Sequence, residues 1–392
     1  MQRFDVVIVG GGPAGSTAAV TLARRGYSVA LLEKEHFPRE KLCGDFLNPV
    51  NWPMLRELGV EEEVLSRPHE KVSKFRFTSF SGEEAEVAFA ESGQAVFGLG
   101  LRRFDLDHVL LKKAGSEGAT VLQACRAREL KRGLNGWSLQ FDRAGVSENL
   151  RARVLIGADG RNSWVAHRLG LAGDSVMRGR SVGFQYQLKC SGRAGGKVEI
   201  HLFRGGYAGL VGLDGDTVNL CLAIERDRLP DHQPAEFALD SCLPQNPWLK
   251  QILRRERASE TRSIYPVYFA PRRACEDGVL LVGDAARVNE PVTGEGVYFA
   301  LKSGSIAGDS IDHAFRKNDF SSAYLSRYVR QCAQTFRFRR GMNSFIRWLM
   351  YRPGLLSPFI RVSARRPRLL DSIVHAICRP ETSTETELLT IK

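Results

Sequence analysis

The sequence predicts an α/β fold with a parallel sheet at its centre, an antiparallel sheet inserted into it, and a helical C-terminal region. Two observations lead to this prediction. Three short apolar runs each end in glycine and aspartate, as central strands of a parallel sheet do when both of their faces are buried. Residues 180–225 instead alternate apolar and polar side chains, a period of two that is typical of half-buried antiparallel strands.

The first apolar run ends in a glycine-rich turn with the spacing Gly10-x-Gly12-x-x-Gly15. A helix over residues 14–24 and a second strand ending at Glu33 are expected to follow. Such a turn lets a pyrophosphate approach the backbone, and the N-terminal amides of the helix attract this anion. Glu33 can accept hydrogen bonds from ribose hydroxyls and offers no countercharge to a 2′-phosphate. The segment therefore predicts FAD or NAD rather than NADP.

The other two runs extend this site. One leads into Asp159-Gly160, and the other leads into Gly283-Asp284, with the residues Pro291–Gly296 shortly afterwards. Ligands of parallel sheets bind at the carboxyl ends of the strands, so three such ends predict one extended cofactor, FAD. Asp284 is expected to hold a ribityl hydroxyl. A helix over residues 296–309 is expected to direct its first amides towards the pyrimidine end of the flavin, which is negative when reduced.

These patterns divide the chain into four parts. We predict a Rossmann-type FAD-binding domain from residues 1–70, 100–165 and 270–310, and an antiparallel substrate domain from 71–99 and 166–269. Residues 311–380 are expected to form a C-terminal helical cap broken by Pro353, Pro358 and Pro367, and residues 381–392 a disordered tail.

The net charge of +12 comes mostly from one segment. Residues 321–380 contain twelve arginines, no lysine and a single acid, Asp371, and they interleave the arginines with aromatic side chains. This composition predicts either helices that lie on an anionic membrane surface or a helical cap with a solvated basic face. No pattern of a nucleic-acid-binding fold is present.

Cysteine, histidine and hydropathy patterns exclude other classes. The eight cysteines contain no Cys-x-x-Cys pair and the eight histidines no metal-ligand spacing, so we expect reduced thiols and no metal. We expect no signal peptide, because the first predicted strand begins within five residues of Met1, and no apolar run is long enough to span a bilayer. The expected location is the cytoplasm, with possible peripheral attachment to the inner face of a membrane.

Several of these segments resemble the flavoprotein superfamily of para-hydroxybenzoate hydroxylase: Gly12-Pro13-Ala14-Gly15, Arg103-Phe104-Asp105, Ala158-Asp159-Gly160 and Gly283-Asp284-Ala285. Within it, residues 37–44 and 291–304 resemble the geranylgeranyl reductase branch. The resemblance implies that Arg103 contacts the FAD phosphate or ribityl region. It also implies that Asp159 and Gly160 shape the cofactor side of the cleft, and that residues 41–45 lie beside the flavin ring.

Together these arguments predict a set of cofactor-binding residues: Gly10, Gly12, Pro13, Ala14, Gly15, Glu33, Lys34, Lys41, Cys43, Gly44, Asp45, Arg103, Asp159, Gly160, Gly283, Asp284, Pro291, Gly294, Gly296 and Val297.

Two residues are candidates for catalysis. Cys43 would donate a proton or contact substrate, or else be a small packing residue of its loop. Tyr207 would donate a proton or hydrogen bond to substrate, or else be a core tyrosine. It stands in the segment 206–212, where geranylgeranyl reductases show Tyr-x-Trp-x-Phe-Pro; the Trp position is Gly209 here, which would widen a substrate tunnel.

The predicted function is that of an FAD-dependent oxidoreductase that reduces C=C bonds of a hydrophobic, isoprenoid or lipid-like small molecule. The alternatives are a monooxygenase that hydroxylates an aromatic or polyketide ring, a halogenase and a non-catalytic flavin-bound lipid carrier. The halogenase is disfavoured because the chain has no Trp-x-Trp-x-Ile-Pro, and the carrier because the cofactor frame is intact. With only one Gly-x-Gly-x-x-Gly, the electrons would come from NAD(P)H that visits the flavin cleft or from a partner reductase.

Overall fold

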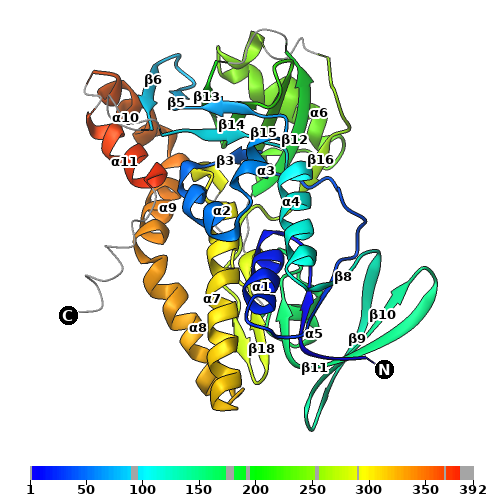
Figure 1. Cartoon of the computed structure of the whole chain (residues 1–392). Coiled ribbons are helices and arrows are strands. Elements are labelled where there is room, and N and C mark those ends of the chain that lie inside the picture. Colours follow the sequence, from blue (N-terminus) through cyan, green and yellow to red (C-terminus); the bar gives the residue numbers. More distant parts are fainter. Residues whose placement is uncertain are drawn as a thin grey trace.

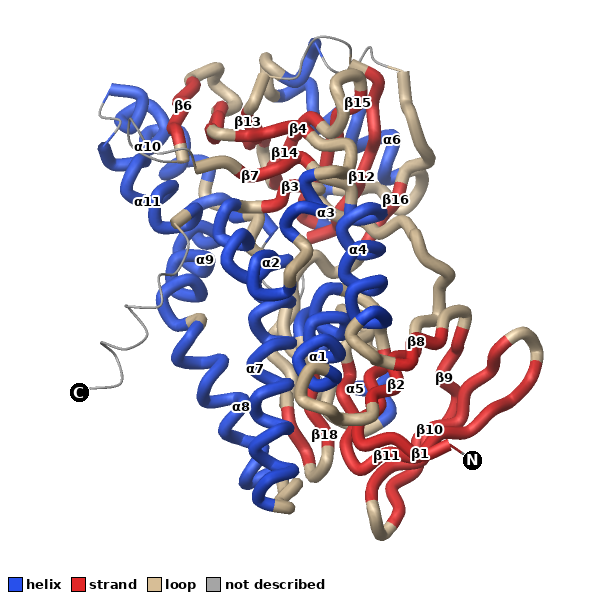
Figure 2. The backbone as a smooth tube through the Cα atoms, viewed as in Figure 1, coloured by secondary structure: helices blue, strands red, loops and turns tan. Residues whose placement is uncertain are grey.

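The computed structural model describes residues 2–89, 96–173, 181–190, 195–251, 256–288, 291–365 and 368–379. The predicted disordered tail, residues 381–392, lies outside these ranges. Two large sheets stand one above the other, and long helices run along one side of both (Figures 1 and 2).

The lower sheet has the order β17-β18-β11-β1-β2-β8. Its parallel members are β1 (Gln2–Val9), β2 (Val29–Leu32), β8 (Thr120–Leu122), β11 (Val146–Gly157) and β18 (Val279–Leu281). Antiparallel β17 (Cys275–Glu276) closes one edge, and the hairpin of β9 (Cys125–Gly133) and β10 (Gly136–Arg143) extends from β11. The carboxyl ends of β1, β11 and β18 lead into the three glycine-containing segments.

Helices cover this sheet. The core on one face packs α1 (Pro13–Ala23), α4 (Arg103–Ser116) and α7 (Gly296–Lys317) against the apolar strands, while the short α5 (Trp164–Arg168) belongs to the core on the other face. We expected α7 to end at Asp309, but it continues to Lys317 and stops at Asn318, whose left-handed backbone ends the helix. The buried stripe that continues through Ile311 and Ala314 explains the extra length.

The upper sheet is mostly antiparallel and has the order β16-β12-β15-β14-β13-β5-β6. Its strands are β5 (Lys74–Thr78), β6 (Glu84–Ala88), β12 (Ser181–Lys189), β13 (Lys197–Phe203), β14 (Gly206–Gly212), β15 (Thr217–Glu225) and β16 (Arg262–Ile264). The Asp214–Gly215 turn joins β14 to β15, with Gly215 at a φ of 83°. One face packs on the segment around α6 (Pro234–Phe237), and the other faces the lower sheet and the C-terminal helices.

A small third sheet lies beside the upper sheet, where β4 (Glu70–Val72) contacts β13. It consists of β3 (Phe46–Leu47), β7 (Gly98–Gly100) and β4, and the short helices α2 (Trp52–Leu58) and α3 (Glu61–Leu65) come between β3 and β4 in the chain.

The C-terminal region contains α8 (Ser322–Thr335), α9 (Arg337–Met350), α10 (Pro353–Arg365) and α11 (Arg368–Cys378). Helix α8 runs beside α7, whereas α9, α10 and α11 pack against the upper sheet near β5 and β6 (Figure 1). Pro353 begins α10, but the break expected at Pro358 is wrong, because α10 continues through it. A single lost helix hydrogen bond is tolerable where the helix is held by tertiary packing. Pro367 lies outside the described residues.

Among the described residues, no helix is both long enough and apolar enough to cross a membrane.

Candidate active site

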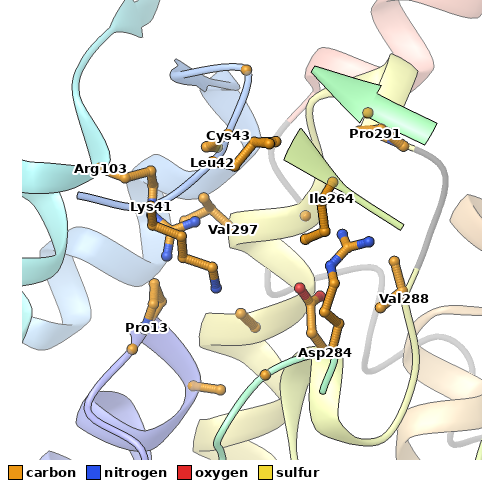
Figure 3. Close-up of a pocket in the computed structure, with 18 of the residues that line it drawn as sticks. Pro13, Lys41, Leu42, Cys43, Arg103, Ile264, Asp284, Val288, Pro291 and Val297 are labelled. Carbon is orange, nitrogen blue, oxygen red and sulfur yellow. The ribbon is translucent and has the colours of Figure 1, made fainter. Parts of the chain in front are cut away.

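A cavity of about 1040 Å³ lies between the strand ends of the lower sheet and the inner face of the upper sheet. In Figure 3, Lys41 and Asp284 reach into it from opposite sides, and Pro13 lies at the start of α1. Its walls combine the three glycine-containing segments, the loop 39–44 and strands of the upper sheet. The predicted site residues that line it are Gly10, Gly12, Pro13, Ala14, Glu33, Lys34, Lys41, Cys43, Gly44, Arg103, Asp159, Gly160, Tyr207, Asp284, Pro291, Gly294, Gly296 and Val297.

Three predicted cofactor residues do not line this cavity. A Cβ at Gly15 would lie 2.0 Å from the carbonyl oxygen of Gly10, so Gly15 lets α1 pack against the turn. Gly283 has a φ of 56° and would place a Cβ 2.9 Å from that of Ala14, so it spaces neighbouring segments. Asp45 is buried behind the cavity wall. Any effect of these three on a cofactor would therefore be indirect.

The turn before α1 presents backbone donors to the cavity. Gly10 has a φ of 108°, and a Cβ there would lie 2.4 Å from the carbonyl oxygen of Ala158, so only glycine fits. Gly12 precedes α1 without a side-chain cap, which leaves the first amides of the helix available to an anion. The Glu33 carboxylate accepts a 2.7 Å hydrogen bond from the Gly11 amide, so this acid also fixes the shape of the turn.

The far end of the cavity is built in a similar way. Gly296 and Val297 at the start of α7 line it, and no side chain caps this helix. Around the cavity, a Cβ added at Gly44, Gly160 or Gly296 would meet no atom within 4 Å. In the described part of the chain, the buried Oδ1 of Asp159 has no hydrogen-bond partner, and burial raises the pKa of this carboxyl. Two uncapped helix ends, an acceptor at each strand end and open space suit an extended dinucleotide such as FAD.

A buried charge cluster supports the loop beside this cavity. Arg103 donates two hydrogen bonds to Asp107, of 2.6 and 2.8 Å, and Arg39 lies 3.0 Å from the same carboxylate. Burial opposes the charge of Arg103, but Asp107 outweighs it and the pKa of Arg103 is raised. Burial lowers the pKa of Lys41, and the Arg103 cation lowers it further. The cluster therefore presents positive charge to the cavity while Asp107 keeps it bound to the fold.

Cys43 is held by the upper sheet through its backbone. Its carbonyl oxygen accepts hydrogen bonds from Gln185 Nε2 at 3.0 Å, Asn219 Nδ2 at 2.9 Å and Cys221 Sγ at 3.0 Å. Burial raises the pKa of the Cys43 thiol, and the neighbouring Arg103 guanidinium works in the opposite direction. Cys43 is therefore a positioned, neutral thiol in the cavity wall at neutral pH.

Asp45 belongs to the same network without reaching the cavity. Its Oδ1 accepts from the Arg103 amide at 3.2 Å and its Oδ2 from Gln185 Nε2 at 3.1 Å. Burial raises the pKa of this carboxyl to about 7 and outweighs the hydrogen bond from the Arg103 amide, which lowers the pKa. Asp45 thus couples the Cys43 loop to α4 and β12.

The part of the cavity under the upper sheet is apolar. Tyr207 is buried in this wall, and a Cβ added at the nearby Gly209 would lie 3.8 Å from Ile200 Cδ1, an ordinary contact distance. The apolar lining there also includes Phe75, Val198, Ile200, Ile264, Val267 and Val292. Such a wall favours an apolar ligand.

Several polar lining residues were not identified from the sequence, among them Arg39, Arg161 and Cys221. Arg39 lies inside the segment 37–44 that carries the family resemblance, so the sequence could have indicated that it belongs to the site. Arg161 follows Gly160 directly and donates to the carbonyl oxygen of Pro266 at 2.6 Å. The sequence around Cys221 is that of an ordinary strand. Only its hydrogen bond to the carbonyl oxygen of Cys43 distinguishes it, and that contact is not visible in the sequence.

Comparison with known proteins identifies the family. The family described as FAD binding domain matches residues 3–336, most of the chain. This chain belongs to that FAD-binding family. It is an FAD-dependent oxidoreductase, which agrees with the FAD-sized cavity and with the cofactor predicted from the three strand ends.

The relatives include both reductases and a halogenase. A digeranylgeranylglycerophospholipid reductase of Methanothrix thermoacetophila is 30% identical over 352 residues, which cover 84% of this chain and 83% of the relative. A 1H-pyrrole-2-carbonyl-(peptidyl-carrier protein) chlorinase of Pseudomonas fluorescens is 28% identical over 357 residues, 83% of this chain and 79% of the relative. The structure of a geranylgeranyl bacteriochlorophyll reductase-like protein from Thermoplasma acidophilum has a TM-score of 0.83 at 22% identity and covers 100% of both chains. This last likeness shows the shared fold.

Proposed function

We propose that this oxidoreductase reduces a C=C bond of a hydrophobic, isoprenoid or lipid-like substrate. The observation that carries the proposal is the composition of the cavity under the upper sheet. Its walls are apolar, and the neutral, positioned thiol of Cys43 stands at their edge. The reductase that is 30% identical over 84% of this chain adds support from a related sequence.

In this proposal the two halves of the cavity have separate tasks. FAD, when bound and reduced, supplies hydride to one carbon of the double bond. The uncapped starts of α1 and α7 would bind the pyrophosphate and the ring end, with Glu33 and Asp284 as acceptors for cofactor hydroxyls. The apolar wall orients the substrate and excludes water.

The second carbon needs a proton, which we assign to the Cys43 thiol. A raised pKa keeps the proton on sulfur until the double bond is reduced, and the nearby Arg103 guanidinium would then stabilise the thiolate that remains. The thiol must be reprotonated by water before the next turnover. Tyr207, buried in the adjoining wall, would orient the substrate.

The electron donor would be NAD(P)H or a partner reductase. The sequence contains a single Gly-x-Gly-x-x-Gly, which the FAD site uses. A nicotinamide donor would therefore have to enter the flavin cavity itself and leave before the substrate reacts.

The second candidate is an oxygen-dependent reaction on an aromatic ring, either hydroxylation or halogenation. The chlorinase of similar length and identity favours it. The two proposals differ in their need for oxygen. A reductase should convert a polyprenyl substrate under strict anaerobiosis with chemically reduced FAD, one double bond per two electrons. Product that forms only when oxygen is admitted would overturn the reductase proposal and support the alternative.

We also propose that the C-terminal helices rest on an anionic membrane, from which an apolar substrate would enter. Exposed apolar side chains on α9 and α10 support this proposal: Phe338, Phe345, Trp348, Leu355 and Val362. Not all nearby arginines are free for lipid, because Arg339 is buried against Glu295 at 2.7 Å and Arg361 binds Glu83 at 2.9 Å. These two hold the helices to the body instead.

Liposome co-sedimentation tests this attachment. Binding to anionic vesicles should weaken with salt, because the Debye length falls from about 10 Å at 0.1 M to about 3 Å at 1 M. Phe338→Ser combined with Trp348→Ser should lower the salt-resistant part. Equal sedimentation with neutral and anionic vesicles would contradict attachment through charge. No sedimentation with either at low salt would contradict membrane binding and leave a helical cap with a solvated basic face.

A further inference from the structure

Three arginines, one from the FAD-binding part and two from the C-terminal helices, lie close enough for their charges to interact: Arg347 acts on Arg287, and Arg287 acts on Arg340. Arg287 follows the Asp284 segment, and Arg340 and Arg347 lie on α9 two turns apart. The Arg347 guanidinium stacks 3.9 Å from the ring centre of Tyr268, and that of Arg340 lies 5.1 Å from the ring centre of Phe336. All three side chains are half-buried, and stacking holds two of them in place.

The charges of this arginine cluster are not neutralised within the described residues. There, no carboxylate forms an ion pair with any of the three, and the buried Nε atoms of Arg287 and Arg340 have no hydrogen-bond partner. Burial lowers the pKa of Arg287 and of Arg340, and a neighbouring cation adds to each shift, Arg347 for Arg287 and Arg287 for Arg340. Grouping three cations in this way costs free energy, which an anion would recover.

Other buried arginines among the described residues have acceptors within the fold; Arg272, for example, donates to the carbonyl oxygens of Ala285 at 2.9 Å and Arg161 at 2.6 Å. Arg103 is bound to Asp107 at 2.6 Å, and Arg339, adjacent in sequence to Arg340, is bound to Glu295 at 2.7 Å. Each of these three guanidinium groups therefore has an acceptor within the fold. The cluster stands out because it gathers three guanidinium groups that act on one another and that have no carboxylate partner in the described residues.

Residues next to the cluster in sequence line the large cavity. Val288, next to Arg287, and Val267, next to Tyr268, both line that cavity. Ile346, next to Arg347, lines a second, apolar cavity of about 60 Å³, which shares Phe75 and Val292 with the large one. An anion bound by the cluster would thus lie close to residues that line both cavities, whose lining includes apolar side chains.

We propose that Arg287, Arg340 and Arg347 form a phosphate-binding site that holds the phosphorylated end of a ligand entering the flavin cavity. Three guanidinium groups offer planar pairs of N–H donors. A phosphate group has more acceptor oxygens than a carboxylate and can therefore accept hydrogen bonds from more of these donors. The ligand would be either a phosphate or diphosphate ester of the apolar substrate or the phosphate groups of a nicotinamide donor. This site does not depend on the reaction proposed above, since anion binding is measured without turnover.

The test is calorimetric titration of the FAD-loaded protein with inorganic pyrophosphate at low ionic strength. We expect saturable binding of one pyrophosphate per chain. Arg287→Gln and Arg347→Gln should each weaken it at least tenfold, and Arg347→Lys by less, because lysine keeps the charge but loses the paired donors. The matched control is Arg352→Gln, which removes an exposed arginine of the same region and should change the dissociation constant less than twofold. Retained FAD content and circular dichroism exclude unfolding.

A second pair of measurements identifies the ligand. If the substrate carries the phosphate, Arg347→Gln should abolish the preference for a prenyl diphosphate over the corresponding prenol. If the donor carries it, the same variant should abolish the preference for NADPH over NADH in flavin reduction. The proposal is overturned if wild-type protein shows no saturable pyrophosphate binding. It is also overturned if Arg352→Gln weakens binding as much as the cluster variants do, because attraction to the general positive charge would then explain the result.

Discussion

The half of the large cavity in which we propose that the cofactor binds and the half in which we propose that the substrate binds are lined by different kinds of groups. The cofactor half consists of backbone amides, glycines and acids at strand ends, in segments that are each continuous in sequence. The substrate half consists of apolar side chains from β5, β13, β14 and β15 and of one loop thiol, brought together from distant positions. Changes in the cofactor half should therefore be felt as lost FAD, and changes in the substrate half as lost or altered turnover with FAD retained.

The largest effect should follow from Gly15→Val. A Cβ at this position would lie 2.0 Å from the Gly10 carbonyl oxygen, so α1 could not keep its place beside the turn. We expect purified protein without bound FAD, or no folded protein, read from the ratio of flavin to protein absorbance. Gly341→Ala in α9, where a Cβ meets nothing within 4 Å, is the control and should keep full FAD content. Wild-type FAD occupancy in the Gly15→Val protein would show that this turn is not part of the cofactor site.

Asp284→Ala should weaken FAD binding without loss of the fold. A hydrogen bond between a charged group and a hydroxyl contributes about 1.5–3 kcal/mol, which corresponds to roughly one to two decades in affinity. Dialysis followed by flavin titration measures the dissociation constant. Asp309→Ala, a partly exposed acid on α7 outside the cavity, should leave it unchanged. Equal occupancy in both variants would show that this strand end does not hold the cofactor.

Cys43→Ser tests the proton donor of the substrate half. The hydroxyl retains the size of the side chain but has a much higher pKa than a thiol, so proton donation should slow. We expect product formation to fall at least tenfold, or about 1.4 kcal/mol in activation free energy, with FAD still bound. Cys275→Ser, outside the cavity, should keep its rate. Unchanged turnover in Cys43→Ser would show that the thiol is not the proton donor and that Cys43 only packs in its loop.

Gly209→Trp should narrow the substrate half alone. The Cβ position has room, since Ile200 Cδ1 lies 3.8 Å away, so the indole would extend into the cavity. We expect kcat/KM for a long-chain substrate to fall about tenfold while a short analogue reacts as before, a difference worth about 1.4 kcal/mol. FAD content should not change. An equal loss for both substrates would mean that Gly209 does not limit chain length.

The smallest effect concerns Asp45 and pH. Because its folded pKa of about 7 lies above the ordinary value, folding favours the protonated carboxyl. The stability contributed by this proton is fully present below pH 4 and is lost as the pH rises through 7. Asp45→Asn cannot lose that proton, so its melting temperature relative to wild type should increase by a few degrees between pH 5 and pH 8. Thermal unfolding at both pH values measures this; a difference independent of pH would contradict it.

The sequence was sufficient to predict those features that are built within a single short segment. The turn at Gly10–Gly15, the acid at Glu33 and the strand leading to Asp284 could each be predicted from spacing, because every group involved lies within a few residues. The surroundings of Asp45 and of Cys221 could not be predicted in this way. The burial of Asp45 and its partner Gln185, 140 positions away, depend on how the loop meets β12.

The arginine-rich segment shows the same division. Its composition predicted helices with a basic face, and four helices stand there. Composition could not separate Arg339, buried against Glu295, from Arg340, which joins Arg287 and Arg347 without an internal acid in the described residues. Adjacent residues on a helix point about 100° apart, so their surroundings depend on neighbours from other elements.

By itself, the sequence determined the cofactor and the class of fold, because backbone turns, helix starts and strand ends are local structures with local signatures. Tertiary structure decided the shape of the substrate half, the environment of Cys43 and the grouping of Arg287, Arg340 and Arg347. These depend on burial and on contacts between residues tens of positions apart or more, and the free energies of such contacts are set by packing rather than by the order of residues in one segment.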